Sequence, residues 1–391
     1  MWSFPFGNKH TPIAIDLGAD SIKLLQMRKM GGRLSVSACA RWRLPESAHH
    51  DAAKRKELAV CAVREILKRE GFRGRWAISA LSCEQLSIKS VRLPHLPEDE
   101  LAEAVQWEAK ERFGFDVGPG QLRYLNAGQV RQGAETRDEV IIMAAPREEV
   151  ELHLEMLSQM GLVPQHIDAQ PVALFRVFER FLRRQADAQA VSVIVDLGKA
   201  ATRVVVARGR QIVFVKSVDI GGRKFTEATA KQLNLSYEEA DELRIRAARE
   251  HLEGSGSEAK DQRPDQPGGA NSLSWAVRDA MRSEVENLGR ELALCLRYCA
   301  VTFRGLRADR VTLTGGEAYD SAVAGLFKEQ LKIECVLGHP LRGIDCSAVD
   351  FGSDRRGTLA EWAACTGLAM RNADAKDIGQ EADHGEHRLS A

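Results

Sequence analysis

The alternation of hydrophobic and polar positions predicts strands and helices in turn along the first half of the chain. Apolar residues cluster over residues 13–44 in a pattern typical of two or three strands, broken by the turn "MGGR" at Met30–Arg33. A helix is expected over Ala52–Glu70, where Gly71 ends it. Further strands are expected at "RWAISAL", "LSIKSVRLP" and "EVIIMAAP", and further helices at "LPEDELAEAVQWEAKERF", Arg147–Met160 and within "HIDAQPVALFRVFERF". In the first of these helices, Leu101, Val105, Ala109 and Phe113 form one apolar ridge at a spacing of four residues.

The second half starts again with strands and continues mainly with helices. Strands are predicted at Val191–Asp196, Thr202–Ala207 and Gln211–Asp219, and helices at Lys224–Leu233, Tyr237–Glu250 and Trp275–Phe303. The stretch between the last two helices, at 253–274, is rich in Gly, Ser, Pro and charge and is expected to be a mobile surface loop. A strand, turn and helix follow at Arg310–Ala318, and "AACTGLAMR" is expected to close the fold as a helix.

One phrase occurs in both halves. "IAIDLGADSIKLL" begins at Ile13, and "IVDLGKAATRVVV" begins at Ile194. Each places Asp-Leu-Gly between two strands and opens its half of the chain. The repetition predicts a duplicated, two-lobed α/β protein with a cleft between the lobes.

Composition narrows the class of protein without naming a function. The 391 residues are 44% hydrophobic and 28% charged, with 55 basic and 55 acidic side chains, as expected for a globular protein without the basic excess of most nucleic-acid binders. No apolar run is long enough for a membrane span, and the start lacks the apolar core of a secretory signal. The eight cysteines include no CxxC pair and fit a reducing cytosol.

Three minor features have a functional and a plain interpretation. Trp2, Phe4 and Phe6 suit either contact with a membrane surface or a loosely packed leader. Cys295 and Cys299 suit either a metal or burial as small side chains, and "DHGEH" near the end suits either a metal or a solvated tail. The plain interpretation is favoured for each.

The repeated turns have the chemistry of phosphate binding. A glycine after the acid permits backbone angles in which successive N–H groups converge on an anion, and nearby hydroxyls and a lysine add donors. Two such turns would hold a polyphosphate, and Asp16 and Asp196 would hold hydrated Mg²⁺ against it. A single Asp-Leu-Gly is more simply the end of a strand, but two of them favour phosphate. A third turn, Leu313–Ala318, has paired glycines that would admit a purine and its ribose.

This order of motifs resembles the actin/Hsp70/FtsA-type nucleotide-binding fold and, within it, the PilM family of type IV pilus assembly proteins. The resemblance covers about Pro12 to Arg371. It is carried by the first repeated phrase and by "LPEDELAEAVQWEAKERFGFD", "SQMGLVPQHIDAQPVALFR", "VDIGGRKFTEAT" and "LSYEEADELR".

The resemblance implies ATP and Mg²⁺ as ligands and assigns residues to parts of their site. Asp16, Gly18, Ser21 and Lys23 match the first phosphate motif, and Asp196, Gly198 and Thr202 match the second. Asp168 and Gln170 match a segment that positions the attacking water, and Asp241, Arg244, Gly315 and Gly316 match the nucleoside motifs. The helix with Asp241 and Arg244 also suits an ordinary solvated face.

The chain departs from the family pattern at each motif. Ala19 and Asp20 stand where small hydroxyl residues are usual, and an inward-pointing Asp20 would repel phosphate. Lys199, Ala200 and Ala201 precede Thr202, so that a hydroxyl donor is missing, and Glu317 stands where glycine is common. These changes favour binding over efficient hydrolysis.

The resemblance also implies four subdomains. They are a first core (12–84 and 161–190) with an inserted FtsA-like subdomain (85–160), and a second core (191–221 and 308–372) with a helical cap (222–307), between a leader (1–11) and a disordered tail (373–391).

The expected function is that of a cytoplasmic scaffold of type IV pilus assembly, peripheral to the inner membrane through its partners. It would bind the N-terminal cytoplasmic peptide of a PilN-like inner-membrane protein in a groove between the core and the inserted subdomain, with Glu103–Phe115 as part of an assembly surface. Other assembly proteins are further expected partners, self-association is an open possibility, and nucleic acid is not expected. The alternatives are a weak Mg²⁺-dependent ATPase, a small-molecule kinase, a scaffold that no longer binds nucleotide, and a component of a type II secretion machine.

Overall fold

A computed structural model of the chain describes residues 10–30, 33–45, 51–82, 84–254, 270–352 and 357–371. The leader aromatics, the centre of the predicted loop and the predicted tail with its "DHGEH" cluster lie outside the described residues.

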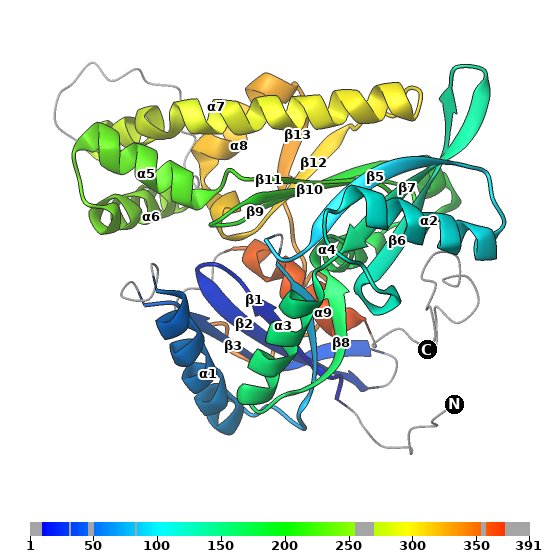
Figure 1. Ribbon diagram of the computed structural model, residues 1–391. Coiled ribbons are helices and arrows are strands. Elements are labelled where there is room, and N and C mark those ends of the chain that lie inside the picture. Colours follow the sequence, from blue (N-terminus) through cyan, green and yellow to red (C-terminus); the bar gives the residue numbers. More distant parts are fainter. Residues whose placement is uncertain are drawn as a thin grey trace. The chain divides into compact units, whose positions relative to one another are not determined.

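The first half builds a five-stranded sheet with the order β3-β2-β1-β4-β8 (Figure 1). Its strands are β1 (Ile13–Leu17), β2 (Ser21–Met30), β3 (Arg33–Arg43), β4 (Trp76–Leu81) and β8 (Val163–Ala169). β1 pairs antiparallel with β2 and parallel with β4, which in turn pairs parallel with β8. The antiparallel hairpin at Asp-Leu-Gly therefore forms as the sequence predicts, and β2 and β3 pair antiparallel up to Met30 and Arg33, while the two glycines of "MGGR" lie outside the described residues.

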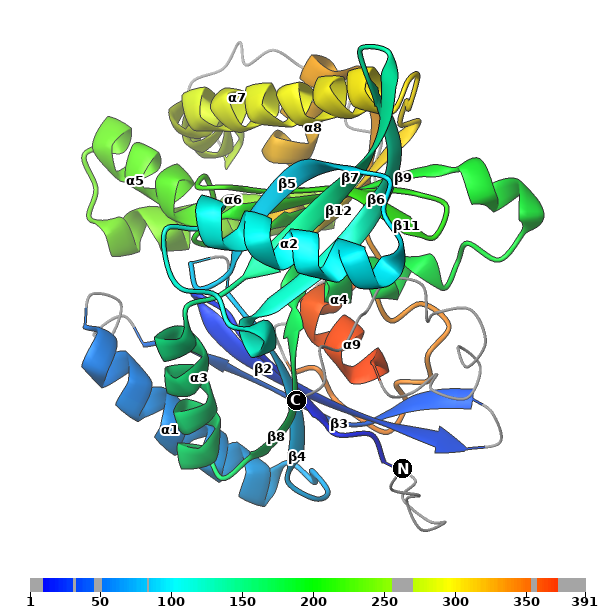
Figure 2. The same cartoon turned by 45° about the vertical axis from the view of Figure 1, so that its right-hand side comes forward.

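Helices cover both faces of this sheet. On one face lie α1 (Ala52–Arg69) and α3 (Arg147–Gln159), side by side in Figures 1 and 2, and they bury Val63 and Leu157 against Ile13 and Ile15. On the other face, α4 (Gln170–Glu179) packs against α9 (Ala363–Met370). All eight residues of α9 are buried, as a helix that is apolar on every side requires.

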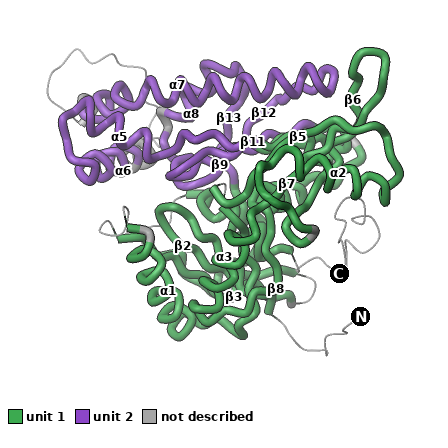
Figure 3. Tube along the Cα trace, viewed as in Figure 1, with its two compact units in different colours: residues 1–190, 205–215, 339–391 green, residues 191–204, 216–338 purple. Residues whose placement is uncertain are grey.

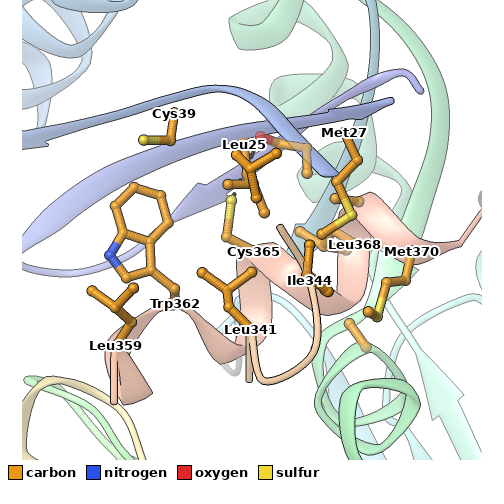
Figure 4. Close-up of a cluster of buried hydrophobic side chains, with 14 of the residues drawn as sticks. Leu25, Met27, Cys39, Leu341, Ile344, Leu359, Trp362, Cys365, Leu368 and Met370 are labelled. Atoms are coloured by element: carbon orange, nitrogen blue, oxygen red, sulfur yellow. Dashed lines mark hydrogen bonds between the residues drawn. The ribbon is translucent and has the colours of Figure 1, made fainter. Parts of the chain in front are cut away.

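The core beneath α9 joins the two ends of the chain (Figure 4). Strand residues from the start of the chain, such as Leu25 and Met27, meet residues from its end. The latter are Leu341, Ile344, Phe351, Leu359, Trp362, Cys365, Leu368, Ala369 and Met370. Trp362 meets Phe351 edge-on, with ring centroids 5.1 Å apart, after the short helix η5 (Ala360–Trp362).

A three-stranded sheet with the order β5-β7-β6 forms within 85–160. Its strands are β5 (Ser87–Pro94), β6 (Leu122–Gln132) and β7 (Glu135–Ala144), and η2 (Pro119–Gln121) precedes β6. The helix α2 (Glu98–Arg112) packs its predicted ridge onto this sheet, since Leu101, Val105, Ala109 and Phe113 share one core with the strands. The predicted amphipathic ridge is confirmed.

The second half repeats the plan of the first sheet. Its strands are β9 (Val191–Leu197), β10 (Thr202–Arg208), β11 (Gln211–Val218), β12 (Arg310–Thr314) and β13 (Glu334–Leu337), in the order β11-β10-β9-β12-β13. As in the first half, the first strand lies between its hairpin partner and a strand that pairs parallel with it. The associated helices are α5 (Gly222–Leu233), α6 (Tyr237–Gly254), α7 (Ala270–Thr302) and α8 (Ser321–Leu331), with the short η3 (Gln185–Gln189) and η4 (Gly316–Tyr319).

The chain divides into two compact units (Figure 3). The first unit contains residues 1–190, 205–215 and 339–391, and the second contains 191–204 and 216–338. No helix in the described part of the chain is both long and apolar enough to cross a membrane.

Some elements differ from the sequence prediction. α7 begins at Ala270 rather than at Trp275, so the predicted loop is shorter at that end. The sequence pattern predicted no element for β6, α8 or β13. Gly128 has a positive φ of 100° where the β6–β7 register shifts, and a bulge of this kind interrupts the alternation by which a strand is predicted.

Candidate functional site

The first Asp-Leu-Gly turn is a tight hairpin that only glycine fits. Gly18 N–H donates to Ser21 O at 3.1 Å, and a Cβ on Gly18 would lie 2.8 Å from that oxygen. Asp16 and Lys23 are register partners across β1 and β2, and their charged groups approach to 3.6 Å. Both side chains are largely buried, so Asp16, Gly18, Ser21 and Lys23 form one local group.

Asp20 is neutralised rather than directed freely at a ligand. Its carboxylate lies 3.7 Å from Arg41 Nη2 on the neighbouring strand β3. Arg55 of α1 donates to Gly18 O at 3.1 Å and secures the turn from another side. The repulsion expected from Asp20 is therefore offset by Arg41.

The second turn has the geometry of the first. Gly198 N–H donates to Ala201 O at 3.1 Å, and a Cβ on Gly198 would lie 2.8 Å from that oxygen. Asp196 is the next-to-last residue of β9, as Asp16 is of β1, and it accepts a hydrogen bond from Arg203 Nη1 at 3.1 Å. The duplicated phrase thus folds into duplicated turns, each with a buried acid beside a cation.

Arg203 is a site residue that the motif search missed. It follows Asp196 by the same seven positions by which Lys23 follows Asp16, so it is the positional counterpart of Lys23. Because the spacing from acid to cation is equal in both repeats, aligning the two phrases on their aspartates would have found it.

The hydroxyl of Thr202 serves the fold. It is fully buried and donates to Ile220 O at 2.7 Å. The carbonyls of Gly198 and Lys199 accept hydrogen bonds from the N–H groups of Gly222 and Arg223 at 3.0 and 2.7 Å, so the turn is fastened to the start of α5.

The third turn lies directly beside the second. Thr314 is the register partner of Asp196 and donates to its Oδ1 at 3.1 Å. Gly315 has a φ of +92°, and a Cβ there would lie 2.3 Å from Leu197 O, so only glycine permits this approach. At Gly316 a Cβ would meet nothing within 4 Å, which leaves open space beside η4.

Asp241 and Arg244 from α6 reach the same place and are held in ion pairs. Asp241 pairs with Lys199 of the second turn and accepts from Thr226 Oγ1 at 2.9 Å. Arg244 pairs with Glu317 Oε2 at 2.7 Å. α6 is therefore not merely a solvated face, because it brings its charged pair to the second and third turns.

These pairs control the protonation of their members. Burial would raise the pKa of Asp241, but the Lys199 ammonium outweighs it and lowers that pKa. Burial would lower the pKa of Lys199 and of Arg244, but carboxylates, with Glu317 foremost in both cases, raise each pKa instead. All three side chains therefore stay charged at neutral pH.

Asp168 and Gln170 lie at the junction of β8 and α4 in the first unit. Asp168 is paired with Arg176 at 2.9 Å and with Arg371 at 3.0 Å. Burial would raise the pKa of Asp168, but the two guanidinium groups lower it below the usual value. The Asp168 carboxylate thus secures the C-terminal end of α9 through Arg371. Gln170, at the start of α4, is therefore the remaining candidate of the predicted pair for orienting water.

Cys295 and Cys299 are buried in α7, which matches the favoured interpretation of small core residues. Among the described residues, no group of three or more His, Cys, Asp or Glu side chains forms a metal cluster.

Comparison with known proteins decides the family. The family model for the type IV pilus assembly protein PilM matches residues 14–250, more than half of the chain. The chain belongs to the PilM family. Within this PilM-family chain, residues 193–347 also match the family model of the cell division protein FtsA.

Solved structures agree on the fold. A chain of a PilM-PilN type IV pilus biogenesis complex is 24% identical, with a TM-score of 0.72 over 92% of this chain and 98% of that chain. The ethanolamine utilization protein EutJ from Carboxydothermus hydrogenoformans is 14% identical, with a TM-score of 0.51 over 94% of this chain and 91% of that chain. The predicted actin-like α/β fold and the predicted PilM family are confirmed.

Proposed function

We propose that this PilM-family protein is an ATP-binding scaffold of type IV pilus assembly. The observation that carries the proposal is the shared geometry of the two turns, since the same glycine contact of 2.8 Å occurs in both and in both an acid pairs with the cation seven residues after it in the sequence. A turn that only ends a strand needs neither the close glycine contact nor the paired acid and cation, yet both halves of the chain have both. A fold family of nucleotide-binding proteins supplies the ligand class.

The residues suit a nucleotide in their chemistry. Backbone N–H groups of the turns, with Ser21 and Lys23, would hold phosphate oxygens, and Asp16 and Asp196 would hold Mg²⁺ through water. The open space beside Gly316, together with Gly315, Asp241 and Arg244, would take the nucleoside. Bound Mg²⁺ would neutralise phosphate charge, and Gln170 would orient water in any slow hydrolysis.

The proposed partner is the N-terminal cytoplasmic peptide of a PilN-like inner-membrane protein. Support comes from family membership and from the fold shared with the PilM chain of the PilM-PilN complex. β5 is at one edge of the three-stranded sheet, and an edge strand offers backbone groups to an extended peptide. Binding it would keep this protein on the cytoplasmic face of the inner membrane.

A second part of the proposal is an assembly surface on α2. Trp107 is 60% exposed on this helix, whose exposed side also carries Glu100, Glu103 and Glu111. A large exposed aromatic ring ringed by charge is a common anchor of protein interfaces, here for other pilus assembly proteins or for a second copy of the chain.

One observation favours a second candidate, a scaffold that no longer binds nucleotide. The cations at the turns already have carboxylate partners, namely Lys23 with Asp16, Arg203 with Asp196 and Lys199 with Asp241. A polyphosphate would compete with these acids unless Mg²⁺ accompanied it.

The test is calorimetric titration of Mg–ATP into the parent and into Asp16→Asn and Asp196→Asn. We expect each variant to raise Kd at least tenfold, because each removes a charge that Mg²⁺ needs while keeping the shape of the side chain. Asp309→Asn, at an exposed position just before β12, is the control and should bind like the parent. Equal binding by all four proteins would refute the site.

The same titrations with a PilN-like N-terminal peptide, with and without Mg–ATP, test the coupling. Nucleotide is expected to change the peptide Kd, because a ligand shifts a conformational equilibrium by its preference between states. A peptide that binds while ATP does not would select the second candidate.

A further inference from the structure

A network of buried charges links the second turn, α6 and η4 in the second unit. Arg244 is its centre, with only 4% of its side chain exposed. It donates to Glu317 Oε2 at 2.7 Å, to Thr226 Oγ1 at 2.8 Å and to Gly222 O at 3.0 Å. Asp241 and Asp320 each lie 4.0 Å from it, and Asp241 also pairs with Lys199.

Glu317 occupies room that a glycine provides. A Cβ on Gly222 would lie 1.9 Å from Glu317 Oε1 and 2.2 Å from its carboxyl carbon. Gly222 begins α5, so the missing side chain leaves a recess at the start of that helix, and the Glu317 carboxylate fills it. The neighbouring Gly316 faces open space.

The recess lies among the groups to which the family resemblance assigns the nucleoside. Arg244 and Asp241 border it from α6, and Gly315 and Gly316 precede Glu317 in the third turn. At position 317 the chain has a carboxylate that supplies the acceptor for Arg244 Nη2. A ribose hydroxyl or a base nitrogen would otherwise supply that acceptor.

We propose that Glu317 is an internal ligand of the nucleoside subsite and sets the affinity and selectivity of this site. The inference rests on the proposed function. A nucleoside must displace the Glu317 carboxylate and give Arg244 Nη2 a new acceptor, because Nη1 bonds to Gly222 O and Thr226 Oγ1 while Nη2 donates to Glu317, and a buried N–H group that loses its acceptor is costly. Phosphate groups at the turns need no such displacement.

The inference predicts which ligands respond to Glu317. Glu317→Ala should tighten Mg–ATP binding about tenfold, while binding of Mg–tripolyphosphate, which has phosphates but no nucleoside, should change less than twofold. Glu329→Ala, at an exposed position of α8, is the matched control and should change neither affinity. Thermal melts of all variants show whether each is folded.

The opposite outcomes are equally specific. Equal gains for ATP and tripolyphosphate would show that Glu317 acts only by general repulsion of anions, and no gain for ATP would show that it does not fill the subsite. Either result overturns the inference. If Glu317→Ala does not fold, Glu317→Gln keeps the shape and an acceptor for Arg244, and a gain of about threefold for ATP alone is expected in its place.

The proposed function and this inference can fail separately. A parent that binds no ATP beside a Glu317→Ala variant that does would reject nucleotide binding by the natural chain and uphold the internal ligand. If the parent binds ATP and the Glu317→Ala variant binds it no more tightly, the proposed function is upheld and the internal ligand is rejected. If neither protein binds ATP, both proposals are wrong.

Discussion

At the scale of the residue, the acids around the candidate site are held by cations of the same unit. In the first unit these pairs are Asp16 with Lys23, Asp20 with Arg41, and Asp168 with both Arg176 and Arg371. Asp168 is the most deeply buried of these acids, with 4% of its side chain exposed. Its charge therefore contributes to stability through partners that water does not screen.

Asp168→Asn should destabilise the fold at neutral pH by about 3–5 kcal/mol, because it leaves two guanidinium groups without their buried anion. The folded-state pKa of Asp168 lies below the usual value of 3.8, so its contribution is fully present above pH 3.8 and is lost as pH falls through the folded pKa. Urea unfolding of parent and variant from pH 7 downward should show a constant difference in the free energy of unfolding that narrows only below pH 3.8. A difference absent at pH 7, or one already narrowing between pH 7 and 5, would contradict this, and the control Asp309→Asn, at an exposed position, should be as stable as the parent.

At the scale of the element, α4 and α9 pack so closely that their crossing depends on one glycine. A Cβ on Gly367 would lie 1.8 Å from Ala173 O, which is backbone and cannot rotate away. Arg176 Nη1 of α4 donates to Gly367 O at 2.9 Å in the same crossing. Helices with a small residue at the contact can approach more closely than side chains otherwise allow.

Gly367→Ala should therefore lower the free energy of unfolding by roughly 1–3 kcal/mol or more, as overpacking does. Gly325→Ala in α8 is the matched control, since a Cβ there meets nothing within 4 Å. The control should be stabilising by up to about 1 kcal/mol, because alanine favours helix over glycine. Chemical denaturation of both variants measures the difference, and a Gly367→Ala variant as stable as the parent would show that the helices simply move apart.

At the scale of the whole molecule, the sequence predicted the order of strands and helices better than it predicted the ion pairs between distant residues. The Asp-Leu-Gly repeat, the ridge of α2 and the strand hairpins follow from local patterns, and the structure confirms them. Arg41 and Arg371 could not be assigned from motifs, because their partners lie in other elements or far along the chain, whereas an alignment of the two phrases would have found Arg203. The same holds for the Glu317–Arg244 pair, whose members are 73 residues apart.

Residues 341–370 complete the hydrophobic core of the first unit, so their removal gives a prediction at this scale. A truncation after Gly338 removes Leu341, Trp362, Leu368 and their neighbours from the core of the first unit, so the first unit should lose its cooperative thermal unfolding, whereas the second unit keeps all its residues. Deletion of Ala375–Ala391, which the sequence predicts to be a polar tail and which lies outside the described residues, should leave Tm unchanged. Differential scanning calorimetry of both truncations tests this, and an unfolding enthalpy of the shorter chain equal to that of the parent would show that the core of the first unit closes without α9.

The reactivity of Cys365 reports how often this core opens. Its thiol is fully buried beneath the first turn and donates to Ala14 O and Lys23 O, and burial together with the charge of Asp16 raises its pKa well above the usual value. An alkylating reagent can therefore modify it only in moments when α9 lifts from β1 and β2, whereas the exposed Cys61 reacts at once. With Cys61 replaced by serine, the rate of alkylation at Cys365 measures the frequency of those openings. A ligand that tightens the first turn would lower that rate, so its binding could be detected without measuring any catalytic activity.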